Sequence, residues 1–259
     1  MAHTLSSRPS TASPPWRRRL YDKVVFLTIL LTLMAPATAD DFMTKREQMV
    51  AAIEQDVRDT RSYLGKDALD ARVKQALLTV PRHEFVPPAE RSSAYENRPL
   101  PIGYGQTISQ PYIVAIMTDL LQLKPGDTVF ELGSGSGYQA AVAAQLAGRV
   151  YTMEIIAPLG DKAKETLTRL NYSNVTVRAG DGYHGWEEHA PFDAIIVTAA
   201  GDHIPPPLLR QLKPGGRMII PVGGFFLTQQ LMLVEKQQDG SIRSREILPV
   251  RFVPITGSH

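Results

Sequence analysis

The chain has 259 residues, of which 43% are hydrophobic and none is cysteine, and its formal charge is +2. This suits one large α/β domain with a short appendage, and it excludes disulfide bonds, thiolate metal sites and a cysteine nucleophile. Residues 1–39 carry five basic residues and one acid, which leaves 23 basic and 25 acidic residues, a charge of −2, for residues 40–259. The body therefore lacks the basic stripe that nucleic-acid binders need.

Residues 1–39 are expected to form a disordered leader that begins with a segment rich in Ser, Pro and Thr. Within it, residues 16–39 hold an arginine cluster, an apolar run and an Ala-x-Ala site, in the order of a signal peptide. The apolar run is too short for an ordinary membrane span. The competing interpretation is that the true start lies at Met34 or Met43.

Residues 40–107 are predicted to form an N-terminal cover for the domain. The pattern from Phe42 to about Val80 is helical, because apolar residues recur on one face, and Pro81 ends it. Residues 81–107 are rich in Pro, Gly and Tyr, so we expect an irregular segment that wraps over a sheet.

A Rossmann-like α/β core is predicted over residues 108–259. A helix at 110–121 is entered through Ser109 and Pro111, which makes Ser109 a candidate N-cap. Strands and helices then alternate, which predicts a doubly wound, mostly parallel sheet, and Asp239-Gly240 predicts a terminal antiparallel hairpin. Strands are expected at 128–132, 149–153, 174–178, 193–198, 217–222, 229–236 and 245–252, and helices at 138–147, 157–170 and 205–212.

The most informative motif is Glu-Leu-Gly-Ser-Gly-Ser-Gly at residues 131–137. A strand, a glycine-rich turn and a helix at the carboxyl edge of a parallel sheet form a nucleotide-type pocket. The acid Glu131 would repel a pyrophosphate and attract a ligand with an ammonium and a sulfonium, unless it is only a solvated carboxylate at the sheet edge. The glycine spacing also differs from that of dinucleotide sites. The motif therefore favours S-adenosylmethionine over NAD.

The ends of three further strands complete the predicted cofactor site. Glu154 can accept hydrogen bonds from both ribose hydroxyls, or cap the following helix. Asp181 can accept from an adenine amino group, or serve as a turn residue. The small residues that begin at Thr198 leave room for the reacting methyl group. The predicted cofactor-binding residues are Glu131, Gly133, Ser134, Gly135, Gly137, Glu154, Asp181, Gly182 and Thr198. The six histidines show no metal-ligand spacing, so no metal is expected.

Seven short stretches share one resemblance. They are Val80–Val86, Gly105–Pro111, Glu131–Gln139, Gly180–Gly182, Ala190–Val197, Gly215–Arg217 and Val250–Pro254. The second and the last are the specific ones, whereas the glycine loop is common to many methyltransferases. Together the stretches resemble the protein-L-isoaspartate O-methyltransferase family over about residues 45–256. One departure is Ile155, where a charged residue would be expected near the ribose.

The resemblance implies methyl transfer from S-adenosylmethionine to the free carboxylate of L-isoaspartyl residues, with D-aspartyl residues as a further candidate, for protein repair or turnover. The expected partners are damaged proteins and peptides, and the enzyme is expected to be a monomer without nucleic acid or a membrane span in its body. The resemblance also places Ser109 at the active site, with Thr107 and Gln110 beside it. The implied substrate groove consists of Val250, Arg251, Phe252, Val253 and Pro254.

The chemistry agrees with this resemblance. A carboxylate has an ordinary pKa near 4 and is ionised at neutral pH, so no strong general base is needed. Ser109 would then orient the carboxylate by a hydrogen bond without acting as a nucleophile. Two alternatives are a methyltransferase for another acceptor and a catalytically idle, exported binding module. Cofactor supply favours the cytoplasm slightly, and the alternative is export to the periplasm through residues 16–39.

Overall fold

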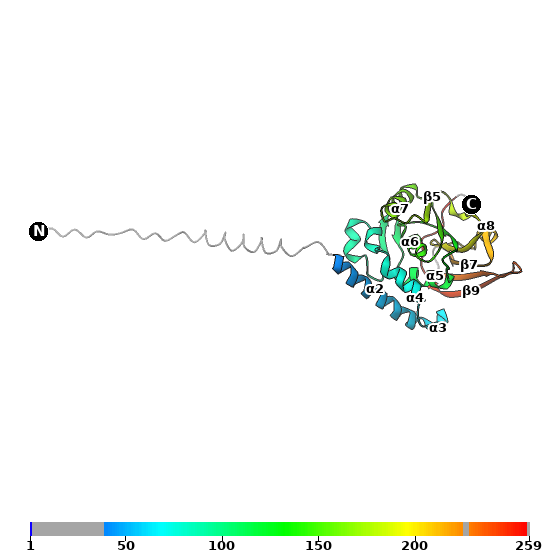
Figure 1. Cartoon of the computed structure of the whole chain (residues 1–259), viewed down its shortest axis with the longest axis horizontal. Helices are drawn as coiled ribbons and strands as arrows, with labels where there is room; N and C mark the ends of the chain where they lie inside the picture. Colours follow the sequence, from blue (N-terminus) through cyan, green and yellow to red (C-terminus); the bar gives the residue numbers. More distant parts are fainter. Residues whose placement is uncertain (2–38, 225–227, 258–259) are drawn as a thin grey trace. The chain divides into compact units, whose positions relative to one another are not determined.

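The computed structural model describes residue 1, residues 39–224 and residues 228–257, and residues 40–259 form one compact unit (Figure 1). Almost all of the predicted leader over residues 1–39 lies outside the described residues. The division of the compact unit into a cover over 40–107 and a core over 108–259 remains a prediction.

Within the described residues, seven strands form one sheet in the order β5-β4-β3-β6-β7-β8-β9. Neighbours from β5 to β7 are parallel, and β8 and β9 are antiparallel to their neighbours. The predicted doubly wound, mostly parallel sheet that ends in a hairpin is therefore confirmed. The strands are β3 (Thr128–Leu132), β4 (Arg149–Glu154), β5 (Val175–Ala179), β6 (Phe192–Val197), β7 (Leu212–Val222), β8 (Gln229–Lys236) and β9 (Ile242–Val250).

The helices of the core are close to the predicted ones. They are α5 (Pro111–Leu121), α6 (Tyr138–Ala144), α7 (Ala157–Arg169) and α8 (Pro206–Gln211), with the short 3-10 helices η3 (Gly182–His184) and η4 (Glu187–His189). Helix α6 is three residues shorter than predicted, because Leu146 and Ala147 both donate to the carbonyl of Ala143 and so close the last turn. Helices α6 and α7 pack on β4 and β5.

The N-terminal cover is more regular than the sequence suggests. It contains α2 (Ala39–Asp59), α3 (Arg61–Leu64), α4 (Ala71–Thr79), η1 (Arg82–Phe85), η2 (Pro88–Ser93), β1 (Leu100–Gly103) and β2 (Gln106–Ile108). The continuous helical pattern predicted over 42–80 is interrupted, since Gly65 ends α3 with φ 73°. The irregular segment predicted over 81–107 contains the β1–β2 hairpin, which turns through Tyr104 and Gly105 with φ 54° and 72°. Two successive positive φ angles make a hairpin turn that Tyr-Gly does not signal.

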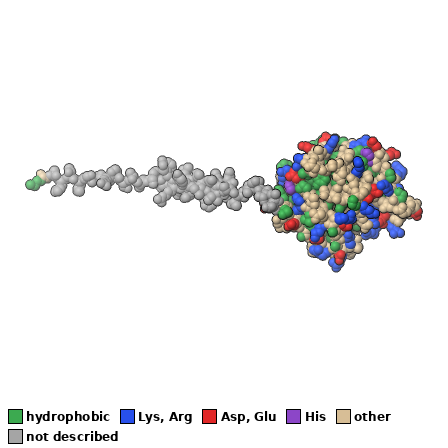
Figure 2. All heavy atoms as spheres, in the orientation of Figure 1, with side chains coloured by type: hydrophobic (Ala, Val, Ile, Leu, Met, Phe, Trp, Pro, Cys, Tyr) green, Lys and Arg blue, Asp and Glu red, His purple; other side chains and the backbone are tan. Residues whose placement is uncertain are grey.

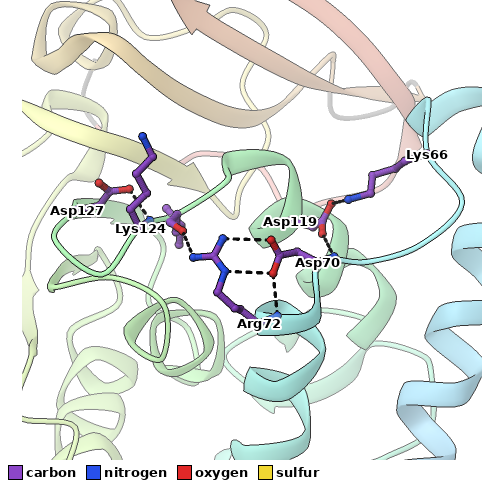
Figure 3. A network of polar contacts seen from close by, with 7 residues as sticks. Lys66, Asp70, Arg72, Asp119, Lys124 and Asp127 are labelled. Carbon is purple, nitrogen blue, oxygen red and sulfur yellow. Dashed lines mark hydrogen bonds and ion pairs between the residues drawn. The ribbon is translucent and has the colours of Figure 1, made fainter.

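A buried acid ties the cover to helix α5 (Figure 3). Asp119, 5% exposed, accepts from Lys66 Nζ at 2.5 Å and from the backbone N–H of Asp70 at 2.7 Å. Asp70 caps α4, and the side chain of Arg72 bonds both Asp70 and the carbonyl of Leu123. The network fixes the cover against α5, whose N-terminal end follows the predicted active-site stretch.

Charged side chains of both signs are interspersed over the face of residues 40–259 that is seen in Figure 2. The hairpin of β8 and β9 extends away from the rest of this unit (Figure 1). Within the described residues, no helix combines the length and the apolar character that crossing a membrane requires.

Candidate functional site

The strand order reverses between β3 and β6, and the carboxyl ends of these two strands open onto a cavity. Such a switch point is where doubly wound sheets bind their ligands. The walls come from the glycine loop after β3, the end of β4, the turn after β5, the end of β6, the β1–β2 hairpin and the segment 253–256. We call this space the cofactor cavity.

The three glycines of the loop have left-handed backbone conformations. Gly133, Gly135 and Gly137 have φ of 93°, 51° and 87°, a region that other residues rarely adopt. A Cβ at Gly133 would lie 2.4 Å from Thr198 Oγ1, whose hydroxyl is within hydrogen-bond distance of the Leu132 and Gly133 carbonyls. Gly133, Gly135 and Thr198 line the cavity.

Gly137 is not among the residues that line the cavity, and its predicted contact with the cofactor stays a prediction. It is the N-cap of α6, and a Cβ there would lie 3.1 Å from Leu167 of α7. Glycine is needed at this position for its positive φ and for close packing of two helices.

Glu131 is not among the residues that line the cavity either, and its predicted contact with the cofactor stays a prediction. The side chain is fully buried, and its Oε2 accepts from Thr152 Oγ1 at 2.5 Å. The hydroxyl of Thr152 lies 2.7 Å from that of Ser134, which does line the cavity. Among the described residues, Oε1 of Glu131 has no hydrogen-bond partner. Burial raises the pKa of Glu131 to about 8.

Glu154 lines the cavity, as expected, and its carboxylate already has two partners. Oε1 accepts from the backbone N–H of Ile156 at the start of α7, and Oε2 accepts from that of Gly135 at 2.8 Å. Ile156 is the N-cap of α7 and no described side chain caps that helix, so Glu154 does not have its alternative capping role. Each carboxylate oxygen can still accept a second hydrogen bond, as the predicted contact with the ribose requires. Asp181 and Gly182 also line the cavity, and Asp181 accepts from the backbone N–H of Tyr183 as a turn residue does.

A second, open hollow adjoins the cofactor cavity, and we call it the peptide groove. It is lined by Pro99, Thr107, Ser109, Gln110, Ile113, Thr198, Thr228, Pro249, Val250, Arg251, Phe252 and Val253. Thr107, Ser109, Thr198 and Val253 line both spaces, and we call these four residues the junction. Of the predicted catalytic residues, Thr107 and Ser109 lie at the junction, and Gln110 lines the groove beside it. Pro254 lines the cofactor cavity and not the groove.

Ser109 is not the N-cap of α5, which corrects one of its two predicted roles. Gln110 holds the N-cap position, and Pro111 is the first helical residue. The carbonyl of Ser109 accepts from Arg82 Nη2 at 2.7 Å. Its hydroxyl makes no hydrogen bond within the described part of the chain, so it can bond a ligand in the junction.

The groove wall is not the extended strand that the sequence predicts up to residue 252. Strand β9 ends at Val250, and the chain continues without regular structure. The amide side chain of Gln229 binds the backbone N–H and carbonyl of Phe252 at 2.6 and 3.1 Å. Ala200 bonds the backbone of Val253 and Ile255 at 2.8 and 2.7 Å. These contacts fix the wall between the two spaces.

Sequence reasoning missed several residues that shape the site. The hydroxyl of Thr152 links the side chains of Glu131 and Ser134. A threonine between Tyr151 and Met153 in a predicted strand was a signal available in the sequence. Gln229 holds the groove wall, but nothing near it in the sequence marks that role. Gln106 of the β1–β2 hairpin lines the cavity, and this contact depends on a turn that the sequence does not signal.

Comparison with known proteins gives a consistent result. The family model described as protein-L-isoaspartate(D-aspartate) O-methyltransferase matches residues 62–259. A Syntrophobacter fumaroxidans protein-L-isoaspartate O-methyltransferase 2 is 63% identical over 239 residues, covering 90% of this chain and 97% of that protein. A Cupriavidus necator protein-L-isoaspartate O-methyltransferase 1 is 56% identical over 258 residues, covering 99% of this chain and 100% of that protein.

Solved structures agree with these relatives. A structure of a protein-L-isoaspartate O-methyltransferase matches with a TM-score of 0.71 and 30% identity, over 82% of this chain and 66% of that one. A Plasmodium falciparum structure named for the same activity, in complex with S-adenosyl-L-homocysteine, matches with a TM-score of 0.64 and 26% identity, over 79% and 97%.

Proposed function

The chain belongs to the protein-L-isoaspartate(D-aspartate) O-methyltransferase family, and we propose that it methylates the free carboxylate of L-isoaspartyl residues in peptides and damaged proteins. The observation that carries this proposal is the junction, where the cavity at the sheet switch point and the adjoining groove share four lining residues. A donor in the cavity and a polypeptide in the groove would meet there and nowhere else along either wall. D-aspartyl residues are a further acceptor to be tested.

The residues of the cavity fit S-adenosylmethionine. The left-handed glycines leave the loop backbone open to close approach by a ligand, and Glu154 keeps free lone pairs for ribose hydroxyls. Asp181 and Gly182 stand where the adenine is expected. Behind the loop, Glu131 is linked to Ser134 through Thr152, and an ionised carboxylate there would favour a cationic ligand over a pyrophosphate. When bound, the cofactor supplies an electrophilic methyl group on a sulfonium.

The chain itself has to bind the two substrates, orient the acceptor carboxylate toward the methyl group, and exclude water. Thr107 and Ser109 offer hydroxyls at the junction, where the acceptor carboxylate would reach the donor. The reaction joins an anion and a cation, so a cavity with little water favours it, together with alignment of the reacting atoms. Arg251 is the one charged side chain among the residues that line the described groove, and it is exposed there to attract an anionic substrate.

The proposal is tested with a synthetic isoaspartyl peptide and S-adenosylmethionine. Mass spectrometry should detect one added methyl group on this peptide and none on the same peptide with ordinary L-aspartate. A third peptide with D-aspartate tests the further acceptor. Methylation of both L-peptides, or of neither, would contradict the proposed specificity; the second result would favour an idle binding module.

The role of Ser109 is tested with Ser109→Ala, using Ser92→Ala as a matched control, because Ser92 is exposed and lies outside both spaces. Since Ser109 caps nothing, the variant should keep its melting temperature and its affinity for S-adenosylmethionine. We expect kcat/KM for the isoaspartyl peptide to fall at least about tenfold, the effect of losing one hydrogen bond to a charged group. Full activity of Ser109→Ala would remove its hydroxyl from the mechanism.

We propose a monomer in the cytoplasm, since the methyl donor is available there. Export to the periplasm through residues 16–39 is the alternative. The N-terminal sequence of protein purified from its native cells decides between them: a start at Asp40 means export, and a start at Met34 or Met43 means cytoplasm. Size-exclusion chromatography with light scattering tests the monomer.

A further inference from the structure

Arg82, in the cover helix η1, is a fully buried cation. Its Nε donates to the carbonyl of Ala94 at 2.8 Å, and its Nη2 donates to the carbonyl of Ser109 at 2.7 Å. Its guanidinium carbon lies 4.8 Å from the ring centre of Tyr138, the first residue of α6 after the glycine loop. One side chain therefore joins the cover, the junction and the helix that follows the cofactor loop.

This arrangement is not what packing alone would select. Within the described residues Arg82 has no carboxylate partner, and its Nη1 has no hydrogen-bond partner. Burial lowers the pKa of Arg82 to about 10, so the side chain is still cationic at neutral pH. A buried charge without a counter-charge is costly, and an apolar side chain of similar size would avoid that cost. The guanidinium instead directs two donors of its rigid fork to two main-chain carbonyls.

We propose that Arg82 is a positioning residue for the isoaspartyl substrate, because its guanidinium holds the main chain of Ser109 at the junction. This inference rests on the proposed function, since it requires the Ser109 hydroxyl to orient the acceptor carboxylate. Ser109 has no helix-capping bond to fix it, and it precedes the first residue of α5 by two positions. The bond from Arg82 is the contact that ties its carbonyl to the cover. Misplacement of an orienting group by about 1 Å can lower the rate about a hundredfold.

Lysine is the informative substitution at position 82. It keeps a cation near Tyr138, but a single ammonium cannot reproduce the two-pronged fork that reaches both Ala94 and Ser109. Arg46 offers a matched control in the same cover. It donates to the carbonyls of Leu78 and Thr79 at 2.6 and 3.2 Å, and it does not contact the junction.

The experiment combines Arg82→Lys, Arg82→Met and Arg46→Lys, each alone and together with Ser109→Ala. For each folded protein we would measure the melting temperature, the Kd for S-adenosylmethionine, and kcat and KM for the isoaspartyl peptide. Arg82→Lys should lose about tenfold or more in kcat/KM while its cofactor Kd changes less than about threefold. Arg46→Lys should lose stability with kcat/KM nearly unchanged. In the Ser109→Ala background, Arg82→Lys should add less than about threefold, because the group that it positions is already absent.

If Arg82→Lys lowers kcat/KM by the same factor in the Ser109→Ala background as in wild type, Arg82 acts independently of Ser109. That result would overturn this inference and leave the proposed function standing. Wild-type kcat/KM in folded Arg82→Lys would overturn it too. Failure of both Arg82 variants to fold would assign the residue to stability and overturn its positioning role. Full activity of Ser109→Ala by itself would instead remove the role proposed for Ser109, and the inference with it.

Discussion

Replacing Glu131 with glutamine tests whether the buried carboxyl beneath the glycine loop senses the charge of the cofactor. Its pKa of about 8 keeps roughly nine molecules in ten protonated at pH 7 without ligand. A sulfonium and an ammonium in the adjacent cavity would favour the ionised form. Binding should then release up to ~0.9 proton per cofactor at pH 7, whereas Glu131→Gln has no proton to release at this position.

Calorimetry in buffers of different ionisation enthalpy measures the number of protons released. The cofactor's own amino group titrates in both proteins, so the difference between wild type and Glu131→Gln isolates the buried carboxyl. The affinity of wild type relative to the variant should rise about ninefold from pH 6 to 7 and about fivefold from pH 7 to 8, in step with the ionised fraction of Glu131. Above pH 8, where Glu131 is ionised, the variant should bind the cofactor more weakly than wild type, because it lacks the carboxylate charge that favours the cation.

The same substitution should change the stability of the protein without ligand. The unfolded carboxyl has a pKa near 4.5 and the folded one is raised to about 8. The unfolded state therefore binds fewer protons in this window, and wild type loses stability relative to Glu131→Gln as pH rises from 4.5 through 8. The loss is at most ~5 kcal/mol, from 3.5 units at about 1.4 kcal/mol each. Equal proton release by the two proteins, or a stability difference that does not change with pH, would refute the reasoning.

Other residues give three further predictions. At saturating cofactor and peptide, kcat should not rise through an enzyme pKa between about pH 6 and 8, because the acceptor is already ionised; a steep rise in the measured profile would indicate an amine or hydroxyl acceptor. Gly133→Ala should abolish detectable cofactor binding in calorimetry, since its Cβ would meet Thr198 Oγ1 at 2.4 Å and φ is 93°; retained affinity would contradict the described loop. Arg251→Gln should raise the peptide KM at low salt and flatten its salt dependence, with the cofactor Kd unchanged; an unaltered salt dependence would exclude Arg251 from attracting the substrate.

The sequence alone determined the features that depend on local pattern. Alternating apolar strands and helices specified the doubly wound sheet, and Asp239-Gly240 marked the hairpin that ends it. The glycines of the loop marked the turn that follows β3, because glycine is the residue that allows a tight turn and close approach of a ligand. The strand ends supplied Glu154, Asp181 and Thr198 to one cavity, since the carboxyl ends of parallel strands share one edge.

Only the tertiary structure decided the burial and pairing of the polar groups. Glu131 is fully buried because its strand lies between β4 and β6, where it pairs in register with Thr152 and Ile196. Ser109 is released from capping because Gln110 takes the N-cap position, and its carbonyl is held by Arg82, 27 residues earlier in the chain. Local periodicity carries no information about such distant neighbours, because burial and hydrogen bonding depend on which segments the fold brings together.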